Sequence, residues 1–289
     1  MVQFNFNGSI HTGSTLEVNI NNRGVNYGDG IFETLRYAHG RLNFWEDHYF
    51  RLMASMRIVR MDIPMNFSPE YLQQQIEKTL KANALENAAA RVKIVVLRKP
   101  GGYYTPQHRE INYLITVSEL PEANYRLNPK GLHIDLFKDY YKPQGLLANL
   151  KTTSAQLYTV AGIFCKENNW DEVILLNSQK EVVEAVSANI FILTAENEIE
   201  TPPLESGCLK GVMRKNVIRI LGEMGYEVHE RAFNPFALQK AQEIFLTNAV
   251  KGIQWVGRYR KKEFGHDLST KLVRRLQADV ALKGGMAIS

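Results

Sequence analysis

The sequence predicts an α+β protein built from two domains. The chain has 289 residues, which suits two domains of ordinary size. Short segments of alternating hydrophobicity are mixed with longer segments of helical periodicity, as in α+β folds. A polar, proline-bearing stretch at 120–124 is typical of a linker. We therefore place a small α+β domain at residues 1–120, a linker at 121–130 and a larger domain at 131–289.

The first domain is expected to begin with a hairpin, because apolar residues alternate on both sides of an Asn7-Gly8 turn. A glycine-bearing stretch at 23–30 leads into a strand at 31–37, which His39-Gly40 turns back. On the helix that starts near residue 46, His48, Arg51 and Ser55 share one face. The periodicity then predicts a helix and two strands, at residues 69–83, 91–98 and 111–118.

The second domain is expected to mix strands and helices in the same way. A turn at 177–181 is predicted to join two of its strands, 173–176 and 190–193. A helix should begin near Gly211 and end at Gly225. The other predicted elements are strands at 131–137 and 244–246 and helices at 155–167 and 268–282.

Composition and charge exclude several classes of protein. Hydrophobic residues make up 45% and charged residues 22%, as in an ordinary globular chain. The net charge of +5 is spread along the sequence, so nucleic-acid binding is not expected. Two cysteines, Cys165 and Cys208, make neither a disulfide framework nor a zinc site. With no signal-peptide pattern and no long apolar stretch, we expect a cytoplasmic protein without a membrane partner and without a metal.

Four features of the sequence suggest catalytic or ligand-binding residues. Lys151 lies in a Leu-Lys-Thr-Thr-Ser run, and a partly desolvated lysine can form a Schiff base. Glu184 stands among apolar residues, so it would need a cationic partner if it points inward. Gly211 opens a helix whose free N–H groups suit a phosphate, and Arg51 offers a planar, charged donor. Taken singly, each feature has an ordinary structural explanation.

Taken together and in this order, the four segments resemble the fold-type IV family of pyridoxal 5′-phosphate (PLP) enzymes, the class IV aminotransferases. This family includes branched-chain and D-amino acid aminotransferases and 4-amino-4-deoxychorismate lyase. The resemblance covers nearly the whole chain. The matching segments are RGVNYGDGIFETLR at 23–36, the helix of His48 and Arg51, LKTTS at 150–154, DEVILLNSQKEVVEAVSANIFIL at 171–193, TPPLESGCLKGVMR at 201–214 and FLTNAVKGIQWV at 245–256.

The resemblance implies a fold with a small N-terminal and a larger C-terminal domain and PLP between them, in a homodimer. Lys151 would hold PLP and carry the substrate proton, and Glu184 would pair with the pyridine nitrogen. Arg51 would bind the phosphate together with the N–H groups that open the helix. The resemblance also places further residues at the cofactor, namely Tyr158, Asn189, Gly211, Val212, Met213, Asn248 and Ala249. Candidates for substrate binding are Tyr27, Arg36 and Arg98. A purely structural role for these three residues is an equal alternative.

The resemblance leaves two reactions open. Thr247-Asn248-Ala249 and the residues around Gly211 look like the lyase branch, whereas Tyr103 stands where some lyases have a second substrate-binding arginine. We expect a PLP-dependent aminotransferase acting on an amino acid, branched-chain type favoured, with a 2-oxo acid acceptor. The alternative is 4-amino-4-deoxychorismate lyase, which releases pyruvate in p-aminobenzoate and folate synthesis. A PLP-binding protein without turnover is disfavoured, because binding alone does not require Glu184.

Overall fold

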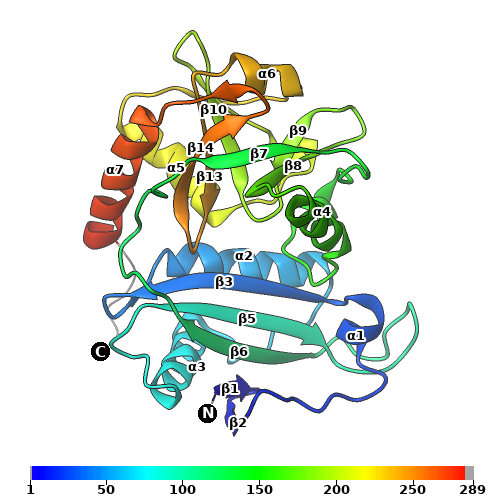
Figure 1. Ribbon diagram of the computed structural model, residues 1–289. Helices are drawn as coiled ribbons and strands as arrows, with labels where there is room; N and C mark the ends of the chain where they lie inside the picture. Colours follow the sequence, from blue (N-terminus) through cyan, green and yellow to red (C-terminus); the bar gives the residue numbers. More distant parts are fainter. Residues whose placement is uncertain (1, 284–289) are drawn as a thin grey trace. The chain divides into compact units, whose positions relative to one another are not determined.

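The computed structural model describes residues 2–283 and divides them into two compact units (Figure 1). The first unit contains residues up to Asn124 and, from further along the chain, Lys151–Ala155. The second contains Tyr125–Leu150 and Gln156–Ala281. The boundary after Asn124 falls within the expected linker at 121–130, whereas Lys151–Ala155, assigned by sequence to the larger domain, groups with the first unit. Among the described residues, no helix has the length and apolar character needed to cross a membrane.

The described residues of the first unit form one antiparallel sheet. Its strands are β1 (Gln3–Phe6), β2 (Ser9–Thr12), β3 (Gly30–Ala38), β4 (Arg41–Leu42), β5 (Ala90–Arg98) and β6 (Ile111–Glu119). They lie in the order β2-β1-β6-β5-β3-β4. The predicted Asn7-Gly8 turn joins β1 to β2 with both residues at positive φ, 50° and 90°, and Phe6 pairs with Ser9.

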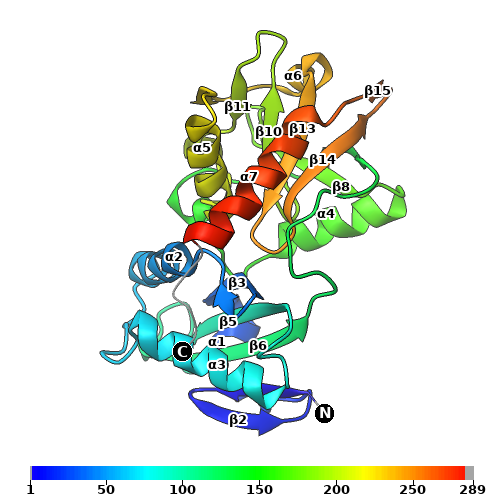
Figure 2. The same cartoon turned by 90° about the vertical axis from the view of Figure 1, so that its left-hand side faces the viewer.

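Two long helices cover one face of this sheet (Figure 2). They are α2 (Trp45–Ile58) and α3 (Pro69–Ala82), and a short helix α1 (Arg23–Tyr27) precedes β3. The expected cap of α3 is present, since Ser68 Oγ accepts a hydrogen bond from the N–H of Tyr71 at 3.2 Å. The apolar stripe of each helix meets alternate residues of β3, β5 and β6 in a single core. Leu52, Ile76 and Ile94 are all buried there.

The described residues of the second unit form a larger mixed sheet. Its strands are β7 (Leu132–Phe137), β8 (Glu172–Leu176), β9 (Val182–Ala185), β10 (Asn189–Leu193), β11 (Ile199–Thr201), β12 (Val228–Glu230), β13 (Glu243–Asn248), β14 (Gly252–Tyr259) and β15 (Lys262–Glu263). They lie in the order β12-β11-β10-β13-β14-β7-β8-β9, with β15 paired to β14. The α-helices are α4 (Gln156–Glu167), α5 (Val212–Glu223), α6 (Pro235–Lys240) and α7 (Asp267–Lys283), and two 3₁₀ turns are η1 (Leu146–Asn149) and η2 (Leu204–Ser206).

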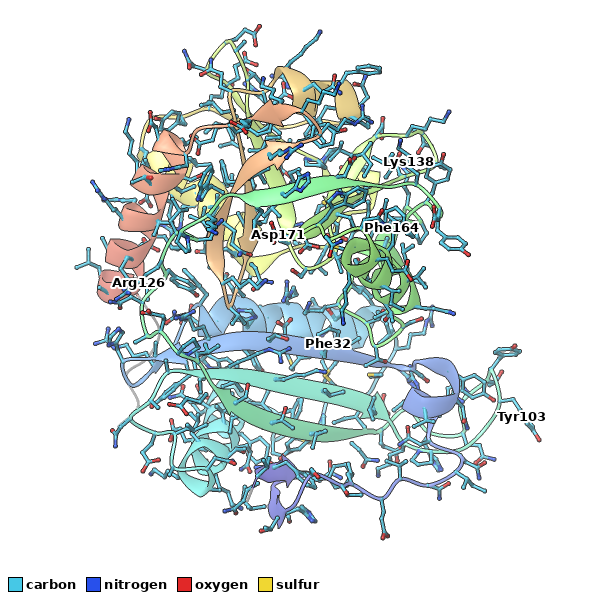
Figure 3. All side chains as sticks on the ribbon, viewed as in Figure 1. Phe32, Tyr103, Arg126, Lys138, Phe164 and Asp171 are labelled. Atoms are coloured by element: carbon cyan, nitrogen blue, oxygen red, sulfur yellow. The ribbon has the colours of Figure 1, made fainter. Side chains whose placement is uncertain are left out.

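Strand β8 shows how this sheet is buried on both faces. Val173 and Leu175 pack with Phe137 and Phe164, the latter on α4 and labelled in Figure 3. Ile174 and Leu176 belong to a second core on the opposite face. Because successive side chains of a strand point to opposite faces, every residue of β8 is buried and its sequence is continuously apolar after Glu172.

The connection after β8 differs from the one predicted from the sequence. The turn at 177–181 does not lead directly to 190–193 but to β9, which pairs antiparallel with β8. Residues 190–193 lie in β10, which pairs with β11 and β13. The sequence Val-Val-Glu-Ala of β9 places a charge in the middle of an apolar run, so its strand character was hidden from hydrophobicity alone.

Candidate active site

The segment around Lys151 is held against the start of β3 in the first unit. The N–H of Phe32 donates to Lys151 O at 2.8 Å, and the N–H of Thr153 donates to Gly30 O at 2.9 Å. Strand β4 pairs only with the far end of β3, which leaves this end to bind the lysine segment. Two motifs that lie far apart in the sequence, 23–36 and 150–154, are therefore joined by backbone hydrogen bonds.

Glycines in the first motif permit this close approach. A Cβ at Gly30 would lie 2.9 Å from Thr153 Oγ1, and a Cβ at Gly28 would lie 3.2 Å from Ser154 Cα. Gly28 also adopts the left-handed conformation that ends α1, and its carbonyl accepts a hydrogen bond from Thr153 Oγ1 at 2.8 Å. The ammonium of Lys151 lies over the Phe32 ring, 4.5 Å from its centroid. Phe32, labelled in Figure 3, belongs to the predicted motif at 23–36 but was not among the predicted site residues.

Glu184 is buried in the second unit with a side-chain exposure of 3%. It lies opposite Leu175 in the register of β8 and β9, so its side chain shares the face that α4 covers. Tyr158, on α4, donates a hydrogen bond to Glu184 Oε1 at 2.7 Å. Burial, followed by the charge of Glu184, raises the pKa of the Tyr158 phenol, which therefore stays a hydrogen-bond donor.

The inward position of Glu184 was predicted to require a cationic partner, and the structure supplies Lys142. The Lys142 ammonium lies 3.2 Å from Glu184 Oε1, and its side chain is also 3% exposed. Sequence reasoning missed Lys142, because it lies in a polar loop with no periodicity or motif. The ion pair between Lys142 and Glu184 becomes visible only in the tertiary structure, where the register of β9 turns Glu184 inward.

Asn189 and Gly211 connect Glu184 to the start of α5. Asn189 Nδ2 donates to Leu209 O at 2.9 Å and lies 3.5 Å from Glu184 Oε2, while the N–H of Leu209 donates to the same oxygen at 2.8 Å. A Cβ at Gly211 would lie only 2.0 Å from Asn189 Oδ1, which explains the glycine. Helix α5 begins at Val212, as predicted, and Gly211 gives it no side-chain cap.

The start of α5 therefore has the properties of an anion site. Its first turn has no acidic residue and no side-chain cap, so the N–H groups of Val212 and Met213 are not satisfied by a cap. The helix dipole adds partial positive charge at this end. The Val212 and Met213 side chains carry no hydrogen-bond donor, so the backbone N–H groups are the donors at these two positions.

Arg51 belongs to a buried ion cluster in the first unit. Its Nε and Nη2 donate to the two oxygens of Glu33 at 2.7 and 2.6 Å, and Glu33 Oε2 also lies 2.7 Å from His48 Nδ1. His48 and Arg51 thus share one face of α2, and that face meets β3. Burial alone would raise the pKa of Glu33, but Arg51 and His48 together lower it to about 2. Burial lowers the pKa of His48, so the neutral ring donates its Nδ1–H to Glu33.

The three substrate-side candidates have contacts within the first unit. Arg36, 5% exposed, donates to the carbonyls of Glu122, Ala123 and Asn124. Arg98, 6% exposed, pairs with Asp29 and donates to two carbonyls after α2. These contacts favour a structural role for both arginines, and their substrate role stays a prediction.

Tyr27 and Tyr103 lie nearer the surface of that unit. Tyr27 is 38% exposed, and the Arg23 guanidinium lies 4.9 Å from its ring centroid. Tyr103, labelled in Figure 3, is 84% exposed on the loop after β5. Both aromatic rings can therefore contact a molecule outside this unit.

Asn248 and Ala249 form the turn after β13. Asn248 Oδ1 accepts hydrogen bonds from the N–H groups of Val250 and Lys251, and Ala249 O accepts one from Tyr125. The neighbouring Thr247 hydroxyl is buried without a hydrogen-bond partner. These contacts account for the shape of the turn, and a role at the cofactor stays a prediction for both residues.

Comparison with known proteins extends over nearly the whole chain. The family model described as "Amino-transferase class IV" matches residues 30–259. An aminodeoxychorismate lyase from Vibrio harveyi is 28% identical over 267 residues, covering 91% of this chain and 95% of the relative. A putative branched-chain-amino-acid aminotransferase from Methanocaldococcus jannaschii is 27% identical over 295 residues, covering 98% and 97%.

A solved structure has the same fold. The branched-chain aminotransferase from Thermoproteus uzoniensis superposes with a TM-score of 0.86 at 24% identity, covering 98% of this chain and 95% of that one. The matched range 30–259 therefore extends over parts of both units.

Proposed function

Because this chain belongs to the class IV aminotransferases, whose members are PLP-dependent, we propose that it transfers the amino group of an amino acid to a 2-oxo acid. Among amino acids we favour the branched-chain type. Two observations, one in each unit, carry the proposal: Lys151 is anchored on β3, and Glu184 is buried and accepts hydrogen bonds from Tyr158 and Leu209. A reactive amine and a buried carboxylate are the two groups that PLP chemistry needs from a protein.

Each unit supplies groups of the kind that this cofactor requires. Lys151 would hold it through the amine, and Glu184 would pair with the ring nitrogen. Arg51 would bind the phosphate together with the uncapped N–H groups of Val212 and Met213. Tyr158 and Asn189 would act through Glu184, to which both side chains lie within hydrogen-bonding distance.

The chain's own residues would perform two tasks during the reaction. When bound, PLP accepts the electron pair left at the substrate Cα after deprotonation. Lys151 would take the proton from that Cα, and the Phe32 ring beneath the amine shields one side of it from water. Glu184 would pair with the protonated ring nitrogen, because a carboxylate that accepts three hydrogen bonds and pairs with the Lys142 ammonium is fixed in orientation.

A second candidate is 4-amino-4-deoxychorismate lyase. It is favoured by the 28% identity to the Vibrio harveyi lyase over 95% of that protein and by the Asn248-Ala249 pair. Both reactions begin with removal of the Cα proton by the same lysine. They differ in whether the amino group is transferred or pyruvate is eliminated, which depends on the pocket and the substrate.

A paired assay of the purified protein tests the two candidates. One arm follows glutamate formed from 2-oxoglutarate and a panel of L- and D-amino acids. The other arm follows pyruvate released from aminodeoxychorismate. Lys151→Ala serves as the inactive reference, and Lys271→Ala, at an exposed lysine of α7, as the matched control. Leucine, isoleucine or valine as the best donor supports the proposal, whereas pyruvate release without transamination selects the lyase.

A further inference from the structure

Lys142 is a buried lysine whose three N–H bonds all have acceptors. It follows β7 and is fixed there by its own backbone N–H, which donates to Leu176 O at 2.8 Å. Its ammonium contacts Glu184 Oε1 at 3.2 Å, Ala148 O at 2.9 Å and Gly207 O. A lysine with 3% side-chain exposure is stable only when its charge is compensated in this way.

The three acceptors belong to three functional segments. Ala148 lies three residues before Lys151 in the chain, and Gly207 lies four residues before Gly211, the N-cap of α5. Glu184 is the carboxylate assigned to the ring nitrogen. The Lys142 ammonium therefore binds the Glu184 carboxylate, the segment that precedes Lys151 and the segment that precedes Gly211.

Both carboxylate oxygens of Glu184 already have two partners each. Oε1 interacts with Tyr158 and Lys142, and Oε2 interacts with Leu209 and Asn189. A carboxylate offers about four lone-pair directions, so these four donors already use them. A ring-nitrogen donor must therefore share or replace one of them. The Asn189 contact is the longest at 3.5 Å, whereas Lys142 is held in place by two carbonyls as well.

We propose that Lys142 is a positioning residue that supplies the counter-charge of Glu184 and holds this carboxylate oriented for the cofactor. The inference rests on the proposed function, since it assigns Lys142 a role toward the PLP ring. Removal of the ammonium would leave Glu184 as a buried carboxylate without the counter-charge of Lys142, which is energetically costly and would disturb the position of the carboxylate. A displaced carboxylate would stabilise a protonated ring nitrogen less well.

A double-mutant cycle measured by PLP equilibrium dialysis tests this role without relying on turnover. Lys142→Met should weaken PLP binding about tenfold or more in the wild-type background. In a Glu184→Gln background the same change should weaken it less than about threefold, because the charge that Lys142 compensates is gone. Equal losses in both backgrounds would overturn the proposal and leave Lys142 as a tie between loops.

Lys262→Met is the matched control. Lys262 also donates to two carbonyls, those of Gln239 and Ala241, at 2.7 and 2.6 Å. Its substitution removes comparable hydrogen bonds but leaves Glu184 and its donors in place. Both variants should lower the melting temperature of the PLP-free protein, and only Lys142→Met should change PLP affinity and the absorbance spectrum of the bound cofactor. A matching PLP loss in Lys262→Met would overturn the assignment.

Lys142→Arg covers the case in which Lys142→Met does not fold. It keeps the charge beside Glu184 but cannot reproduce the ammonium geometry at both carbonyls. PLP affinity within about threefold of wild type, with a lowered melting temperature, supports the role of the charge. A tenfold loss would contradict it. Wild-type protein that binds no PLP would refute the proposed function itself, whereas PLP-binding wild type with an unaffected Lys142→Met variant refutes only this inference.

Discussion

Glu33→Gln tests the buried ion cluster that holds Arg51. The substitution keeps the shape of the side chain but removes its charge. Glu33 is 2% exposed, and Arg51 and His48 both bind it in the wild type. After the substitution the Arg51 guanidinium, with a side-chain exposure of only 12%, loses the charge of Glu33 beside it.

The expected magnitude follows from the pKa of Glu33. Its folded-state value is about 2, against an ordinary value of 4.5. This difference corresponds to about 3 kcal/mol of stability at pH 7. Breaking a buried ion pair by removal of one partner costs about 3–5 kcal/mol in other proteins, which agrees with this value. We therefore expect Glu33→Gln to lower the free energy of unfolding by about 3 kcal/mol.

The assay is denaturant unfolding of wild type and variant at several pH values. Because the folded-state pKa of Glu33 lies below its ordinary value, the carboxylate stabilises the fold fully above pH 4.5 and progressively less as the pH falls toward 2. The difference between wild type and Glu33→Gln should shrink from about 3 kcal/mol at pH 7 to about 2 kcal/mol at pH 3.5. In thermal unfolding at pH 7 the loss corresponds to about 6–12 °C.

Glu198→Gln is the matched control for a surface carboxylate. Glu198 pairs with Arg231, and their side chains are 45% and 47% exposed. Its loss should cost less than about 1 kcal/mol. If Glu33→Gln costs no more than this control, the buried cluster contributes no net stability. If it costs about 3 kcal/mol at every pH, the loss comes from packing rather than charge, and the reasoning from the pKa is refuted.

Four further predictions concern the cofactor and assembly. Lys151→Ala should abolish turnover and the yellow colour of bound PLP, and borohydride labelling of a different lysine would contradict the assignment. Glu184→Gln should still bind PLP but lose several orders of magnitude in kcat, since a neutral amide cannot hold the ring cation; near-wild-type kcat would exclude this role. Arg51→Ala should weaken PLP binding by about 2–3 kcal/mol, or roughly 30- to 150-fold, with Arg51→Lys recovering only part; unchanged affinity in dialysis would place the phosphate elsewhere. Sedimentation should show a homodimer, and a fully active monomer at micromolar concentration would exclude it.

The sequence by itself determined most of the local structure. Periodicity located the long helices, among them α3 and α7, and the strands β5 and β6 to within a few residues. Turn and cap chemistry located the Asn7-Gly8 hairpin and the start of α3 at Ser68. The ordered motifs were sufficient to identify the family. Such signals are readable because they depend on residues within a few positions of one another.

Tertiary structure alone decided how the charged residues are compensated. Lys142 meets Glu184, and Glu33 meets Arg51, only because strand register and helix packing bring distant segments together. The glycine-bearing motif likewise receives the Lys151 segment because one end of β3 is left unpaired by the short β4. A buried charge requires a partner, but the sequence does not say which residue supplies it, because side chains within reach of one another in space are not neighbours in the chain.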